Sequence, residues 1–276
     1  MIERTILIRR LSFSLYFVIA FLTFLVFLFP FDRVKARLES EARARTPLEL
    51  SIARISPSFI NRFVLVDVVV SDRAGRVLFE SPSVRTHLSL FGFLRGLLSV
   101  DLKAQAYGGS VSLRTEQGAK RQYLSLDADG LDIGSYALFK SFGLKLSGKL
   151  GGSYEATGDA GKGRLLIKNL ASRELKIMGF SVPDLDFDQV WIEGDVKGDR
   201  FIIRKLEMDG KELKVLVSGD LVMRERGTLN LAVKFKPSER LATEQAGLLS
   251  LLKNRDPEGY YLLSLAGTVA EPIPRF

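Results

Sequence analysis

The stretch that decides the fold of this chain reads LKLSGKLGGSYEATG, residues 144–158. Its apolar side chains recur in one phase, at Leu144, Leu146, Leu150, Tyr154 and Ala156. The positions between them carry mainly lysine, serine and glutamate. Successive side chains of a β-strand point to opposite faces, so this period of two predicts a strand with one apolar and one polar face.

The same alternation continues over most of the chain. It recurs in the segments 64–70, 100–106, 213–221, 229–235 and 261–269. Turn sequences separate the strands, at 72–75, 108–109, 158–163, 197–199 and 209–210. Strands joined by such short turns pair with their neighbours in antiparallel fashion. We therefore expect a mainly β fold, an extended, curved antiparallel sheet arranged as a meander.

Two short helices are predicted to interrupt the sheet. Asp132 is a good N-cap for a helix that runs to about Phe142 and ends at Gly143. A longer helix is expected from about Ser238 to just before Asn254. Both are expected to cap the sheet.

The apolar face of the strands needs something to cover it. A sheet buries such a face against another layer, against itself or against a ligand. Two outcomes remain open: a folded-over sheet with a dry core, which is the usual fate of alternating strands, or an open groove that holds acyl chains. Either way, the face contains these residues: Val100, Leu102, Leu144, Leu146, Leu150, Leu213, Val215, Val217, Leu231 and Val233.

The segment 11–31, LSFSLYFVIAFLTFLVFLFPF, contains no charged side chain. About 20 apolar residues in a helix cross a hydrocarbon core roughly 30 Å thick, so one transmembrane helix is predicted. Its apolar anchor residues include Leu11, Phe17, Phe21, Phe24, Phe27 and Phe31. A cleaved signal peptide is the alternative, but the run exceeds the usual apolar region of roughly 7–15 residues and no small-residue cleavage site follows it.

The charged residues on the two sides of the apolar segment do not settle the orientation of the predicted membrane helix. Three arginines precede the apolar segment and five basic residues follow it within 33–45, interleaved with acids. Long domains cross membranes largely regardless of charge. We therefore expect a short cytoplasmic N-terminus at 1–10, the membrane helix at 11–31, a juxtamembrane helix or stalk at 32–46 and a translocated β domain at 47–276.

The composition argues against most kinds of active site. There is no cysteine, and His87 is the only histidine, so thiolate chemistry, multi-histidine metal sites and a Ser-His-Asp triad lack their residues. The net charge of +8 comes from basic residues interleaved with acidic ones, which indicates a solvated surface rather than a nucleic-acid interface. No enzyme activity, cofactor, metal or nucleic acid is expected.

Two partial motifs have simpler explanations as strands. Asp184, Asp186 and Asp188 resemble the start of a calcium loop, but Gln189 stands where that loop needs glycine. The segment 143–150 resembles a phosphate-binding loop, but Leu150 occupies the position of the magnesium-binding hydroxyl. Both segments alternate as strands do.

Taken together, the chain resembles the short form of the type II secretion system protein N family. The resemblance rests on the order of these pieces: LFPFDRVKARLESEA, ELSIARISPSF, VLVDVVVSD, AYGG, LKLSGKLGGSYEATG, VSGDLVM and GYYLLSLAGTVAEPIPRF. The strand-turn-strand at 201–222 and the ending also resemble the repeating units of AsmA-like proteins.

The resemblance implies a bacterial inner-membrane protein with most of its chain in the periplasm. The function it implies is that of an accessory component of type II protein secretion, a scaffold that contacts other secretion-system or envelope proteins through strand edges or loops. The alternative it implies is an AsmA-like protein that binds or transfers lipid, with phospholipid or lipopolysaccharide acyl chains as ligands.

Overall fold

The protein is described from a computed structural model. It describes residues 16–17, 30–59, 61–89, 92, 95–119, 122–137, 139, 145–174, 176–177, 180–181, 183–222, 227–250, 252, 254–268 and 271–275. Most of the predicted membrane segment therefore lies outside the described residues, including Leu11, Phe21, Phe24 and Phe27. Over the ranges given above, no helix combines the length and the apolar composition needed to cross a membrane.

The chain divides into two compact units, Met1–Leu90 and Phe91–Phe276. The first contains α2 (Phe31–Arg45), where a helix was expected at 32–46, followed by three strands. These are β1 (Leu48–Phe59), β2 (Arg62–Asp72) and β3 (Val77–Leu88), paired in that order as an antiparallel meander.

Helix α2 covers the edge of β1 that β2 leaves unpaired. The Glu39 carboxylate accepts a hydrogen bond of 2.9 Å from the backbone N–H of Ile52, and the Lys35 ammonium donates to the carbonyl of Ala53 at 3.3 Å. Side chains thus satisfy backbone groups that another strand would otherwise pair with.

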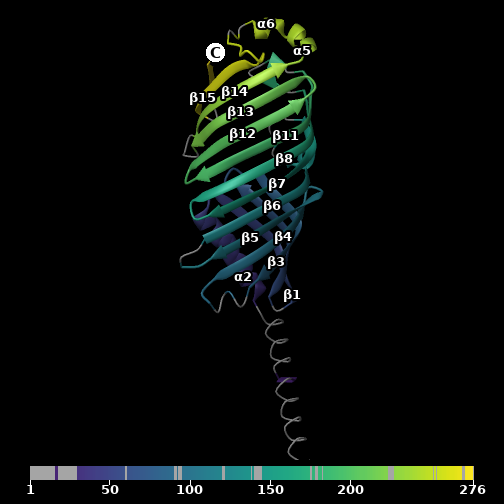
Figure 1. Cartoon of the computed structure of the whole chain (residues 1–276). Coiled ribbons are helices and arrows are strands. Elements are labelled where there is room, and N and C mark those ends of the chain that lie inside the picture. Colours follow the sequence, from purple (N-terminus) through teal and green to yellow (C-terminus); the bar gives the residue numbers. More distant parts are fainter. Residues whose placement is uncertain are drawn as a thin grey trace, which may run out of the picture. The chain divides into compact units, whose positions relative to one another are not determined.

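Over its described residues, the second unit is an antiparallel meander of eleven strands. Its strands are β4 (Leu98–Ala106), β5 (Gly109–Gln117), β6 (Gln122–Asp132), β7 (Lys145–Thr157), β8 (Ala160–Arg173), β11 (Leu185–Lys197), β12 (Arg200–Gly210), β13 (Leu213–Val222), β14 (Thr228–Pro237), β15 (Tyr261–Thr268) and β16 (Pro272–Arg275). They lie side by side in sequence order (Figure 1). A separate hairpin, β9 (Lys176–Ile177) and β10 (Phe180–Ser181), stands between β8 and β11 in the chain. The predicted mainly β, antiparallel fold is confirmed.

The helices of this unit differ from the prediction where they are described. In the segment predicted as a helix after Asp132, Ala137 and Phe139 are helical, and residues 138 and 140–144 lie outside the described residues. Asp132 does act as a cap, with its carboxylate accepting from the Gly134 N–H at 2.9 Å, but the element it starts is a 3-10 turn, Ile133–Ser135. The single helix expected after Ser238 is instead two, α5 (Glu239–Glu244) and α6 (Ala246–Leu249). Gln245 departs from helical geometry between them, and Gly247, two residues further on, has low helix propensity.

The outer edge of β15 is covered by the segment 254–256. Arg255 forms a bridge with Tyr261, and the Leu262 N–H donates to the carbonyl of Asn254 at 3.0 Å. Asp256 holds this segment in place, because its carboxylate accepts backbone N–H bonds from Tyr260 at 2.9 Å and Glu258 at 3.0 Å.

The hydrogen bond from the Tyr260 backbone, followed by that from Lys234, lowers the pKa of the Asp256 carboxyl below its ordinary value. Because the pKa of Asp256 is lower in the folded than in the unfolded state, its ionised carboxylate stabilises the fold at neutral pH. This contribution is lost as the pH falls through the folded-state pKa. We expect Asp256→Asn to speed hydrogen exchange of the Leu262 amide at neutral pH, with the difference from the natural protein vanishing at acid pH. Glu258→Gln, which removes a carboxylate without a side-chain partner among the described residues, is the control, and equal acceleration by both substitutions would contradict this role.

Candidate functional site

Strand pairing aligns the apolar positions of the second unit into rows that run across the strands. One row crosses all eleven strands and is uncharged throughout: Leu102, Leu113, Leu126, Tyr154, Gly163, Gly194, Ile203, Gly219, Leu231, Leu265 and Pro274. Since paired residues share a face of the sheet, these rows define one surface, which we call the apolar face.

A second row runs parallel to the first and is also uncharged. It contains Ala104, Val111, Ala128, Gly152, Leu165, Ile192, Leu206, Val217, Val233 and Leu263. A third row crosses eight strands: Leu131, Leu150, Ile167, Val190, Met208, Val215, Phe235 and Tyr261. The apolar face is therefore continuous rather than divided into separate patches.

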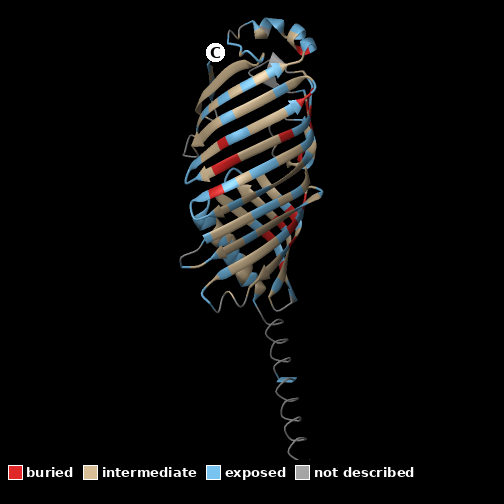
Figure 2. Ribbon diagram, in the orientation of Figure 1, coloured by how far each residue is buried: buried red, intermediate tan, exposed pale blue. Residues whose placement is uncertain are grey.

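The apolar face is only partly shielded from solvent. Figure 2 shows intermediate and exposed residues alternating along the strands, with few buried ones. On this face Leu126 is 36% exposed, Leu165 38% and Leu98 47%. Among the described residues of the second unit, strands pack mainly against their neighbours in the sheet, so no second layer of that unit covers most of this surface.

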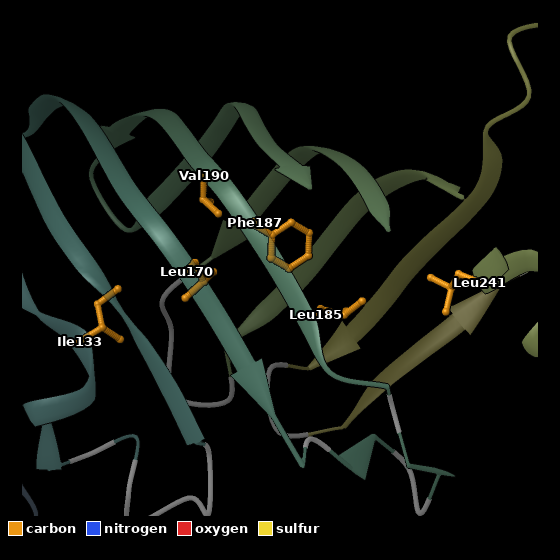
Figure 3. Close-up of a cluster of buried hydrophobic side chains, with 6 residues drawn as sticks. All are labelled: Ile133, Leu170, Leu185, Phe187, Val190 and Leu241. Atoms are coloured by element: carbon orange, nitrogen blue, oxygen red, sulfur yellow. The ribbon is translucent and has the colours of Figure 1, made fainter. Parts of the chain in front are cut away.

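One end of the apolar face is covered. There a buried cluster forms from Ile133, Leu170, Leu185, Phe187, Val190 and Leu241 (Figure 3). Leu241 belongs to α5, and Phe139 also packs against the cluster. The short helical elements thus close one end of the face as a small dry core. Most of the remaining face is partly exposed, although Ala104 and Ile203 are buried there.

Helix α5 is fixed to the turn between β12 and β13. The Ser238 hydroxyl donates to the Glu212 carboxylate at 2.6 Å, and the backbone N–H of Ser238 donates to the carbonyl of Glu212 at 2.8 Å. Arg240 forms an ion pair with the same carboxylate at 3.2 Å. The Ser238 hydrogen bond, with that of Arg240, lowers the pKa of Glu212, so this attachment is ionised and in place at neutral pH.

Two glycines on the apolar face make room for aromatic rings from neighbouring strands. A Cβ on Gly161 would lie 2.3 Å from the Tyr154 hydroxyl oxygen, and one on Gly194 would lie 2.9 Å from the tip of the Phe201 ring. Each ring therefore lies flat across the adjacent strand.

The residues predicted for the apolar face lie together on it. Val100 and Leu102 are on β4, Leu146 and Leu150 on β7. Leu213, Val215 and Val217 are on β13, and Leu231 and Val233 on β14. Leu144 lies outside the described residues.

Sequence reasoning missed the contribution of the central strands β8, β11 and β12. Their residues Ile167, Val190, Leu206 and Met208 belong to the rows above. Irregular pairing between Phe187 and Gln189, and between Ile203 and Leu206, shifts the phase of the alternation. A search that tolerates one-residue phase shifts would have found them.

The opposite, polar face carries hydrogen-bonded ion pairs rather than a reactive site. Asp195, 8% exposed, pairs with Arg204, and Asp186 pairs with Arg173 at 2.6 Å. In the first unit the His87 Nε2 lies 2.9 Å from the amide nitrogen of Asn61, a structural contact. Over the described ranges, no group of three or more acidic or histidine side chains is arranged to hold a metal ion.

Comparison of the chain with protein-family models, with curated proteins and with solved structures finds no match. The feature of the described residues that points to a function is the apolar face. Its chemistry is that of a long, uncharged and partly hydrated surface, which gains free energy when apolar area on it is removed from water.

Proposed function

We propose that the second unit binds the acyl chains of lipids along its apolar face. The observation that carries this proposal is the set of uncharged rows that cross up to eleven strands and in which most residues stay partly exposed, although Ala104, Val190 and Ile203 are buried. A contiguous exposed apolar surface of this extent marks a binding surface in soluble proteins. Acyl chains suit this face because they need no hydrogen bonds, and apart from the hydroxyls of Tyr154 and Tyr261 the side chains of the rows are apolar.

The length of the apolar face fits a lipid path rather than a small-molecule pocket. Neighbouring strands lie about 4.8 Å apart, so ten steps between eleven strands amount to roughly 48 Å. That exceeds the roughly 30 Å hydrocarbon thickness of a whole bilayer. A groove of this length has room for acyl chains placed one after another, which supports movement of lipid along the sheet.

The predicted membrane helix at 11–31 supports the same proposal. An anchored sheet would stand next to a source of lipid, with its charged face in water and its apolar face available to acyl chains. The proposed place is the bacterial inner membrane, with the β units in the periplasm, as the resemblance to AsmA-like proteins implies.

Native mass spectrometry of the full chain tests this proposal. The protein would be extracted from bacterial membranes in a mild uncharged detergent and then released from the micelle in the spectrometer. Phospholipid or lipopolysaccharide bound at about one or more molecules per folded chain is the expected result. A folded chain that carries no lipid would contradict it.

A scaffold role in type II secretion stays a prediction. For such a role, the strand edges decide where a partner protein could bind. Helix α2 covers β1, and the segment 254–256 covers part of β15. Where β15 leads into β16, the Thr268 N–H donates to the Glu271 carbonyl at 3.3 Å. By the alternation of antiparallel pairs, the backbone nitrogens of Pro272 and Pro274 in β16 therefore face away from β15. Proline has no N–H to offer a further strand. Partners of a scaffold would therefore have to use loops, such as those at Gly108 and Gly158, rather than these edges.

A further inference from the structure

The polar face of the second unit contains a hollow of about 460 Å³ between β6, β7, β8 and β11. Gly151, Leu166 and Trp191 line it together with the basic residues Lys149, Arg164 and Lys168. Four members of the apolar rows also contribute to the lining: Ala128, Leu150, Gly152 and Leu165. Leu166 pairs with both Gly151 and Trp191 in the sheet. Gly151, Leu166 and Trp191, like the three basic residues, alternate along their strands with members of the rows described above, which places their side chains on the face away from the apolar one.

The hollow exists because side chains are missing from two adjoining strands. Gly151 has none, and the pairing of β6 is irregular between Ala128 and Leu131 opposite it. Gly130, in that irregular stretch, has a φ of +66°, a conformation that favours glycine. The indole of Trp191 and the side chain of Leu166 are therefore left accessible on an otherwise charged surface.

The cations around the hollow are only loosely engaged with protein acids. The Lys149 ammonium is 3.8 Å from Asp132 and the Arg164 Nε is 3.6 Å from Glu193, both longer than a hydrogen bond. Lys168 has no acidic partner within the described ranges. By contrast, Lys205 on the same face is bonded to Glu207 at 2.5 Å.

The charge balance of the hollow favours an anion. Three cations line it against a single acid, Asp129. Arginine and lysine bind phosphate oxygens through charge-assisted hydrogen bonds, and two lysines with an arginine match a group with several anionic oxygens. Trp191 and Leu166 favour a second, less polar part of the ligand. They offer apolar area, and the indole also has a negative ring face that attracts C–H groups.

We propose that this hollow binds a phosphate group attached to a sugar-like ring, with the ring against Trp191 and the phosphate among the three cations. Such a group occurs both in free sugar phosphates and in the headgroups of some lipids. The site lies on the opposite face from the proposed acyl-chain path and does not depend on it.

Trp191 is the only tryptophan in the chain, so its fluorescence reports on the hollow directly. The full chain, kept in solution with an uncharged detergent, would be titrated with glucose 6-phosphate and, in parallel, with phosphatidylinositol added to the micelles. A saturable change in Trp191 emission is expected with at least one of them.

The outcomes distinguish the source of the ligand. Saturation with the free compound alone assigns a soluble ligand, and saturation with the lipid alone assigns a lipid headgroup. No saturation with either compound overturns the proposal. Unphosphorylated glucose is expected to give no response.

Substitutions at Gly151 separate binding from folding. A Cβ at this position would lie 3.5 Å from its nearest neighbour, the Ala128 carbonyl oxygen, so a side chain is accommodated without a clash. Gly151→Leu is expected to fill the hollow and abolish the response, whereas Gly151→Ala leaves most of the space and should retain it. Both variants should keep the circular dichroism of the natural protein. An undiminished response in folded Gly151→Leu would overturn the proposal.

A charge substitution tests the anion. Lys168→Gln is expected to weaken binding by about tenfold to a hundredfold, the usual effect of losing one charged hydrogen bond. Lys205→Gln on the same face, whose ammonium is already bonded to Glu207, should leave the affinity unchanged. An equal loss of affinity in both variants would show that binding depends only on the overall charge of this face, and would overturn the proposal.

Discussion

Leu165→Glu is expected to remove co-purified lipid from the protein without unfolding it. Leu165 stands in the second uncharged row between Gly152 and Ile192, at 38% exposure. Because the position reaches water, a carboxylate there stays hydrated in the empty protein. An acyl chain bound over this position would have to displace the water around the carboxylate, and burying an unpaired charge costs several kcal/mol. Lipid per mole of protein should fall at least about tenfold, measured by extraction and phosphate analysis.

Ala232→Glu is the matched control for this experiment. Ala232 is exposed on β14 and pairs with Ser218 and Ser264, which places it on the polar face. The substitution adds the same charge to the same sheet, and the lipid content should stay at that of the natural protein. Equal loss in both variants, or no loss in Leu165→Glu, would argue against acyl chains on the apolar face.

Phe187→Ala is expected to be strongly destabilising, because it empties the centre of the dry cluster at the covered end. Phe187 is 4% exposed and packs with Leu170 and Val190, among others. Removing a buried phenylalanine side chain costs about 3–5 kcal/mol through lost burial and the cavity left behind. For a chain of this size each kcal/mol lowers the melting temperature by roughly 2–4 °C, so a fall of about 10 °C is expected in thermal unfolding followed by circular dichroism.

Leu229→Ala is the comparison that distinguishes core from binding surface. Leu229 lies on the same apolar face, opposite Leu221 and Gly267, and is half-exposed. Its truncation removes less buried area, so a loss of about 1 kcal/mol is expected. Comparable destabilisation by both substitutions would mean that the whole apolar face is an ordinary core.

Much of the fold could be predicted from the alternation of side chains. The segments around Leu146, Val215 and Val233 were recognised as strands because their period of two is uninterrupted. The turns at Asp72–Gly75 and at Gly198 were recognised because glycine and aspartate favour tight turns. The helix after Ser238 was predicted too long, since periodicity does not show that the chain breaks at Gln245 to reach the edge of β15.

The sequence by itself determined that one face of nearly every strand is apolar and the other charged, because that is set by residue type and a fixed period. It did not determine whether that face would be covered. Coverage depends on register and on what packs against the sheet: the irregular pairing at Phe187 and Ile203 keeps the rows aligned across strands, and α5 reaches only one end. The hollow beside Trp191 was likewise decided by tertiary structure, because it forms where Gly151 on one strand meets an irregular stretch of another.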